Sequence, residues 1–179
     1  MEATGDQQGT TRYTRMQLFG VVSAAVLATA VSFGLSGVAS ASAGGQVPVK
    51  ARFSGTVAFT GTSSIALRGA GHSSLMGAST NDGIAVISGP PNTAGCIPNV
   101  HTETLTAANG DQLVIESDDL ACPIGPTSLH GTGHWHVVSG SGRFSGATGE
   151  GTFDGEADFG PSFSPGTFSF TLTGALARK

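Results

Sequence analysis

Alternation of apolar and polar residues with a period of two is the feature that most constrains how this chain can fold. Within residues 49–59 the apolar side chains share one parity and the polar side chains share the other. Residues 152–159 and 167–173 repeat the pattern, with phenylalanines on one face and carboxylates or hydroxyls on the other. Because successive side chains of a strand point to opposite faces of a sheet, the pattern predicts strands with one buried and one solvated face.

Five further segments have the composition of strands: residues 64–75, 83–88, 100–107, 111–120 and 129–139. Together with the three segments above they make about eight strands with short connections. The sequence therefore predicts an all-β fold, an eight-stranded antiparallel up-and-down barrel, because closure removes exposed strand edges. A small two-sheet sandwich is the alternative.

Residues 1–43 are predicted to be a secretory signal peptide. Two arginines precede an apolar run over residues 18–31, and small residues lead to Ala43, where we expect cleavage. An uncleaved membrane anchor is the alternative, although glycine and serine dilute the run and it is barely long enough to span a bilayer. We expect a secreted, extracellular protein in which residues 44–179 form a single β-barrel domain without a transmembrane segment.

The charge of the chain excludes some partners. Eight Lys and Arg stand against twelve Asp and Glu, which gives a formal net charge of −4. So few basic groups argue against binding to nucleic acid or to anionic membranes. Charged residues make up only 11% of the chain, a value found in some disordered proteins, but disordered chains do not usually alternate their apolar residues.

The two cysteines are predicted to form a disulfide. Residues 107–111 have the sequence of a three-residue hairpin loop with Gly110 in the left-handed conformation. This register pairs residue i with residue 218 − i, so that Cys96 faces Cys122. In a secreted chain such a pair is oxidised, and closing a loop of about 27 residues stabilises the fold by roughly 3.5 kcal/mol. Two free buried thiols are the alternative.

A glycine-rich segment follows, Gly140-Ser141-Gly142-Arg143-Phe144-Ser145-Gly146-Ala147-Thr148-Gly149. We expect a tight turn in which Gly140 and Gly142 adopt positive φ. Phe144 is expected to tuck beneath the turn, while Ala147 and Gly149 allow the backbone to approach closely. The segment is thus interpreted as a structural turn.

This segment resembles the Gly-Thr-Gly-x-Phe-x-x-Ala-x-Gly signature of dirigent proteins and of the allene oxide cyclase-like barrels, with Ser141 in place of threonine. The resemblance implies an eight-stranded antiparallel barrel of the calycin type, similar to small secreted bacterial relatives. It also implies that a homo-oligomer is to be considered, since plant members are often dimers or trimers. The matched residues belong to the turn, so the resemblance brings no catalytic residue to this chain.

Three histidines, His130, His134 and His136, share one parity of a predicted strand. His-x-His is a metal-ligand spacing, since side chains at i and i+2 project together from a strand. Trp135 has the opposite parity, and burial of its ring gains more free energy than burial of three unpartnered imidazoles. We therefore expect the histidines to face solvent or a subunit interface, where they remain weak candidates for a metal site.

The other polar residues carry no catalytic signature. The register places His101 opposite Ser117 and Glu103 opposite an isoleucine, so no acid–base pair is predicted. Residues 116–119 are interpreted as a polar strand end with weak affinity for calcium at most, and the carboxylates of residues 152–159 as a solvated face rather than a cation site. Nucleophile-elbow and phosphate-loop motifs are absent from the sequence. The sequence assigns no catalytic residue, and we expect no cofactor.

The predicted function is binding. An eight-stranded barrel is either filled by side chains or holds one small ligand, and many inward positions of this chain are glycine or alanine. We expect a non-enzymatic binder of a small apolar ligand, or a scaffold. The side chains expected to line the pocket are Phe53, Arg68, Trp135, Phe168 and Phe170. His72 shares the parity of Arg68 and could join them, although an exposed histidine is the simpler interpretation.

Two other functions fit the same sequence. One is an allene oxide cyclase-like cyclase or isomerase, in which a preshaped apolar cavity steers a reactive intermediate without a nucleophile. The other is a purely structural cell-surface barrel. A phenylalanine-lined cavity with one buried charge would favour the enzyme, a cavity without polar groups a carrier, and a filled interior the structural protein.

Overall fold

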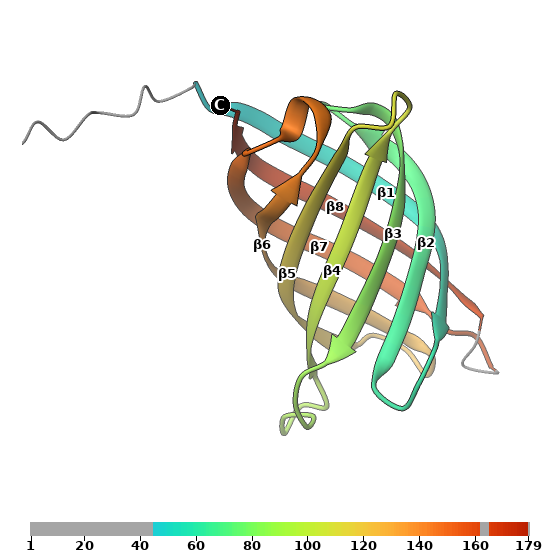
Figure 1. The fold of residues 1–179 in the computed structure, drawn as a ribbon. Helices are drawn as coiled ribbons and strands as arrows, with labels where there is room; N and C mark the ends of the chain where they lie inside the picture. The colour runs from blue at the N-terminus through green and yellow to red at the C-terminus, as the bar shows by residue number, and fades with distance from the viewer. Residues whose placement is uncertain (1–44, 162–164, 179) are drawn as a thin grey trace, which may run out of the picture. The chain divides into compact units, whose positions relative to one another are not determined.

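In the computed structural model, which describes residues 45–161 and 165–178, eight antiparallel strands close into a barrel (Figure 1). Each strand pairs with the next in the chain, and β1 pairs with β8 to complete the closure. The predicted signal peptide lies outside the described residues. The strands are β1 (Val47–Phe59), β2 (Ser64–Ser73), β3 (Gly77–Ile87), β4 (Ile97–Ala107), β5 (Gln112–Pro123), β6 (Ser128–Gly140), β7 (Thr148–Asp158) and β8 (Gly166–Ala177).

The predicted faces are confirmed for the three strands that alternate most clearly. Phe53 of β1, Phe153 of β7 and Phe170 of β8 lie inside the barrel and are 1%, 5% and 3% exposed. Their rings pack on one another, with ring centroids 5.3 Å apart for Phe53 and Phe170 and 5.5 Å apart for Phe153 and Phe170. These aromatic contacts form one side of the barrel interior.

Strands β3 and β7 begin well before the residues that the sequence predicts. β3 starts at Gly77, and the first side chains that it directs inward are Ser79 and Asn81, which are 7% and 2% exposed. β7 starts at Thr148, and its first inward positions are glycines. At the start of both strands the first inward positions lack large apolar side chains, so alternation of hydrophobicity gives no signal there.

Large side chains fill one end of the barrel. Trp135 of β6, Leu176 of β8 and Phe144 are 1% exposed or less. The indole N–H of Trp135 donates to the carbonyl oxygen of Thr173 at 3.3 Å, which satisfies the one polar atom of the buried ring. This end is therefore plugged.

The glycine-rich turn supports the plugged end. Phe144 belongs to a short 3₁₀ helix, η1 (Gly142–Phe144), and is buried beneath the turn as predicted. Gly142 has a φ of +57°, as expected, and Gly146 has a φ of +69°. The expectation of a positive φ at Gly140 is wrong. This residue is needed because a Cβ would collide with the carbonyl oxygen of Phe144.

The predicted hairpin register and disulfide are confirmed. Strands β4 and β5 pair with Ile97 opposite Ala121, and Gly110 in their turn has a φ of +88°. Cys96 and Cys122 are bonded. The bond joins the start of β4 to the end of β5, at the end of the barrel opposite to the plug.

Candidate ligand-binding site

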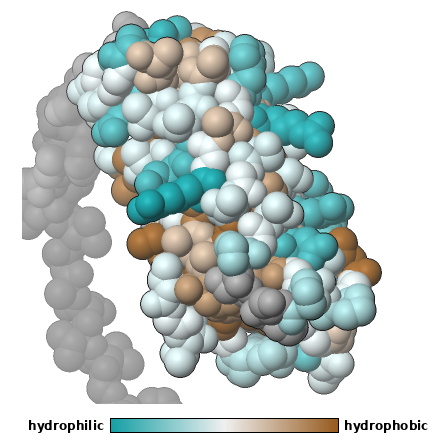
Figure 2. Space-filling model, turned by 90° about the vertical axis from the view of Figure 1, so that its right-hand side faces the viewer, coloured by the Kyte–Doolittle hydropathy of each residue, from teal (hydrophilic) through white to brown (hydrophobic). Residues whose placement is uncertain are grey.

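A pocket lies at the unplugged end of the barrel. We call this end the mouth; it carries the β1–β2, β3–β4 and β5–β6 connections, residues 60–63, 88–96 and 124–127. The cavity volume is about 100 Å³. Seen from the side of β1 and β2, hydrophobic residues gather on the lower half of the molecule, toward the mouth (Figure 2). Exposed apolar side chains at this end include Phe59 and Val86.

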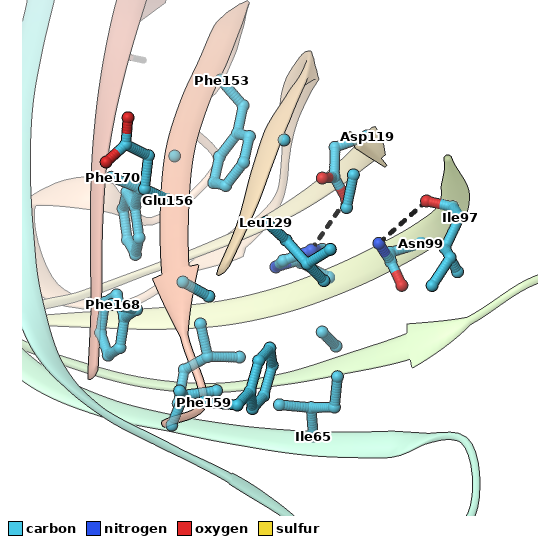
Figure 3. Close-up of a pocket in the computed structure, with 18 of the residues that line it drawn as sticks. Ile65, Ile97, Asn99, Asp119, Leu129, Phe153, Glu156, Phe159, Phe168 and Phe170 are labelled. Carbon is cyan, nitrogen blue, oxygen red and sulfur yellow. Dashed lines mark hydrogen bonds and ion pairs between the residues drawn. The ribbon is translucent and has the colours of Figure 1, made fainter. Parts of the chain in front are cut away.

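Aromatic rings form one wall of the barrel interior. We call this set, drawn from β1, β7 and β8, the phenylalanine wall: Phe53, Phe153, Phe168 and Phe170. Three of its members, all except Phe53, line the pocket, and Figure 3 shows their rings together with Phe159 around the cavity. Phe168 and Phe170 are nearly parallel, at an interplanar angle of 14°. An apolar body can lie against these rings.

The opposite wall is polar. We call the buried polar residues that β3, β4 and β5 direct inward the polar wall: Ser79, Asn81, Asn99, His101, Glu103, Ser117 and Asp119. Asn99, His101 and Asp119 line the pocket, whereas the other members lie deeper in the barrel or on its plugged side. Figure 3 shows Asn99 and Asp119 across the cavity from the phenylalanine rings.

The pair of His101 and Asp119 forms the floor of the pocket. His101 Nε2 lies 2.9 Å from Asp119 Oδ1, and His101 Nδ1 lies 3.6 Å from Glu103 Oε1. The side chains of Asp119 and Glu103 are 3% and 1% exposed. The ring of His101 also packs on Phe153, with centroids 5.3 Å apart, so the floor connects the two walls.

The two carboxylates determine the charge of His101. Burial by itself lowers the pKa of this imidazole, but its interactions with Asp119 and Glu103 outweigh burial and raise the pKa to about 9. His101 is therefore protonated at neutral pH. Its Nε2 contacts Asp119, whereas Nδ1 lies at ion-pair distance from Glu103 and has no hydrogen-bond partner among the described residues.

Two glycines on neighbouring strands make room for these carboxylates. A Cβ at Gly83 of β3 would collide with the Glu103 carboxylate, and a Cβ at Gly131 of β6 would collide with that of Asp119. Any side chain at either position would push a carboxylate toward the middle of the barrel. Glycine at both positions therefore leaves the space that each buried carboxylate occupies.

Several polar atoms of the polar wall have no hydrogen-bond partner among the described residues. They include both side-chain polar atoms of Asn81, both carboxylate oxygens of Glu103 and the hydroxyl of Ser117. Buried polar groups in proteins are normally paired with protein or with ordered water. This wall therefore has hydrogen-bonding capacity that the described protein atoms do not use.

The carboxylate of Asp158 holds the loops at the mouth in place. Asp158 Oδ1 accepts hydrogen bonds from the backbone N–H of Gly160 and from the hydroxyl of Thr127, each at 2.8 Å. The bonds from Gly160 and Thr127 lower the pKa of Asp158. This contact ties the β5–β6 connection to the end of β7.

Some of the predicted pocket residues line the pocket in the structure, and others lie elsewhere. Phe168 and Phe170 line the pocket. Phe53 is buried behind Phe170, and Trp135 lies in the plugged end. Arg68 does not line the pocket. Its side chain is 76% exposed and pairs with Asp82 on the outside of the barrel, because Ile65 and Leu67 take the inward parity of β2. His72, which has the same parity, is exposed too.

The three histidines of β6 lie on the outer face, as expected. His130 Nε2 is 3.2 Å from Asp154 Oδ2, and His136 Nε2 is 3.9 Å from Glu116 Oε1. His134 is exposed. Within residues 45–161 and 165–178, no group of three or more His, Cys, Asp or Glu side chains is placed to hold a metal ion.

The polar wall was not predicted from the sequence. The interpretation of residues 116–119 as a polar strand end is wrong, since they lie within β5 and direct Ser117 and Asp119 inward. The predicted register was right, but it compares only directly opposed residues. His101 and Asp119 are diagonal neighbours, which also come within reach of each other on one face of a sheet. The parity of Leu105 and Leu113, which are 2% and 3% exposed, could have shown that this face points inward.

The fold places this protein in the class of closed eight-stranded antiparallel barrels. Comparison with protein-family models, with curated proteins and with solved structures found no match to the chain. No helix in the described part of the chain has the length and apolar character needed to cross a bilayer.

Proposed function

We propose that this protein is a secreted barrel that binds one small, mainly apolar ligand in the pocket at its mouth. The observation that carries the proposal is the cavity of about 100 Å³ between the phenylalanine wall and the floor, in a barrel whose other end is filled. An eight-stranded barrel has room for one such ligand. The leader-like residues 1–43 and the disulfide support secretion.

The test is an NMR titration of the protein with toluene as an apolar probe. We expect saturable shifts of the alanine methyl groups that line the pocket, Ala85, Ala121 and Ala157. Ala157→Phe should abolish them, because the added ring fills the cavity. Ala70→Phe is the matched control on the exposed face of β2 and should leave binding unchanged. Equal shifts in both variants, or no saturable shift in the wild type, would rule out binding in this pocket.

A second function, an allene oxide cyclase-like cyclase or isomerase, is favoured by the floor of the pocket. The His101–Asp119 ion pair puts charged groups beside an apolar cavity, in place of the single charge expected from Arg68. The glycine-rich turn and the closed barrel are the features that support kinship with dirigent and allene oxide cyclase-like proteins. If the pocket steers a short-lived substrate, the product should be one stereoisomer with the wild type and a mixture with Ala157→Phe.

A further inference from the structure

The pocket combines aromatic rings with hydrogen-bond acceptors. Phe153, Phe168 and Phe170 present ring faces and edges to the cavity, and Asp119 lies across from them (Figure 3). Aromatic faces attract cations, and a carboxylate attracts cations and hydrogen-bond donors. The aromatic rings and Asp119 therefore both favour a cationic group on the ligand.

Acceptor oxygens of Asn99 and Asp119 remain available at the floor of the pocket. His101 Nε2 lies 2.9 Å from Asp119 Oδ1, and His101 Nδ1 lies 3.6 Å from Glu103 Oε1 without a hydrogen-bond partner among the described residues. One side-chain amide N–H of Asn99 donates to the carbonyl oxygen of Ile97 at 3.2 Å, which leaves its second N–H and its amide oxygen. Asp119 uses Oδ1 toward His101 and keeps Oδ2. A ligand that enters the pocket can therefore donate hydrogen bonds to the oxygens of Asn99 and Asp119.

The floor also carries more negative than positive charge, which favours a cationic ligand as well. His101 supplies one positive charge against the two carboxylates of Asp119 and Glu103. No lysine or arginine is among the described residues that line the pocket. The remaining acidic residue of the lining, Glu156, directs its carboxylate away from the phenylalanine rings (Figure 3). An anionic ligand would meet like charge in a site of low dielectric constant.

From these contacts we propose that the ligand is a small amine, with an apolar body against the phenylalanine wall and a protonated amino group bonded to Asp119. This inference rests on the proposed binding function and adds the class of ligand. The cavity is smaller than the 150 Å³ cavity that holds benzene in another protein, so one ring or a short branched chain fills it. A longer body would extend into the mouth.

The test compares four probes that share one ring: benzylamine, benzyl alcohol, toluene and benzoate, each titrated by NMR into the protein expressed from its full-length sequence. We expect benzylamine to bind at least about tenfold more tightly than toluene, and benzoate to bind more weakly than toluene. Benzyl alcohol should lie between benzylamine and toluene, because it donates a hydrogen bond without a charge.

The variant Asp119→Asn removes the charge but keeps the shape of the side chain. We expect it to weaken benzylamine binding by about tenfold or more and to change toluene binding by less than about threefold. Asp154→Asn on the outer face of β7 is the control and should change neither value. If Asp119→Asn fails to fold, the order of the four probes on the wild type still decides the question.

The outcomes separate this inference from the proposed function. If toluene binds and benzoate binds as tightly as benzylamine, the amine preference is wrong while the binding function stands. If no probe binds, the binding function itself is wrong. If benzylamine alone binds but shifts residues outside the pocket, the site assigned to it is wrong.

Discussion

His101 is held between two carboxylates, Asp119 and Glu103, on the polar wall of the barrel interior. Removal of an imidazole from water opposes its protonation, yet two ion-pair partners within 3.6 Å reverse the balance. The protonated ring in turn offsets part of the cost of burying the carboxylates. The three side chains therefore depend on one another, and loss of any one leaves a buried charge with fewer partners.

The pKa of His101 predicts how stability depends on pH. Because the folded state holds this proton to about pH 9 and the unfolded chain releases it near 6.5, the folded state binds more protons between these values. The stabilisation is complete below pH 6.5 and is lost as the pH rises through 9. We expect the free energy of unfolding to fall by about 3 kcal/mol across this range, measured by urea unfolding at a series of pH values.

Two glutamine variants separate His101 from the exposed histidines in this prediction. His101→Gln should be less stable than the wild type at pH 6.5. Its free energy of unfolding should then change little between pH 6.5 and 9. His134→Gln, on the outer face of β6, should keep the decrease. A wild-type protein whose stability is flat between pH 6.5 and 9 would contradict the protonated state of His101.

At the scale of the strands, β6, β7 and β8 show why glycine occurs opposite a large side chain. Gly151 of β7 and Gly174 of β8 are directly paired beneath the ring of Trp135. A Cβ at Gly174 would lie 2.7 Å from Trp135 Cζ2 and would also collide with the backbone of β7. The two glycines thus let the indole lie close to the sheet.

Gly174→Ala is therefore expected to destabilise the barrel by about 2 kcal/mol or more, because neither the backbone nor the buried ring can move away. Gly61→Ala in the β1–β2 connection is the control, since its Cβ would meet no atom closer than 3.9 Å. The measurement is the midpoint of urea unfolding for each variant. If the two substitutions cost the same, the packing of Trp135 on Gly174 does not limit stability.

Strands with apolar inward residues could be predicted from the sequence, and those of the polar wall could not. β1 and β8 alternate clearly because their inward positions are Val, Phe and Leu, which made their faces evident. The first half of β3 directs Ser79 and Asn81 inward, so its beginning had no hydrophobic signal. The disulfide was predictable because it follows from the register of a single hairpin turn.

The residues that line the pocket could not be predicted from the pattern of the strands alone. Which of the buried aromatic residues border a cavity depends on how eight strands close: Trp135 lies in the plugged end, and Phe53 is covered by Phe170. Arg68 is predicted to be the charged residue of the pocket, but Ile65 and Leu67 take the inward parity of β2 and leave it outside. That role falls to His101 and Asp119, which come together only as diagonal neighbours on β4 and β5.

At the scale of the whole molecule, the two ends of the barrel differ in purpose. Trp135, Phe144 and Leu176 fill one end and supply the packed core. The mouth is shaped by the Cys96–Cys122 bond and by the contacts of Asp158, and it opens onto the cavity. A core at one end and a cavity at the other is the arrangement expected of a barrel that binds a ligand.

The most direct test of this account is native mass spectrometry of the untagged protein purified from the cells that produce it or from their medium. We predict one small organic adduct per chain, released on unfolding, together with a mass about two daltons below that of the reduced chain for the disulfide. A chain that carries the disulfide but no adduct, and that takes up none of the four probes, would contradict the binding function and favour a structural barrel.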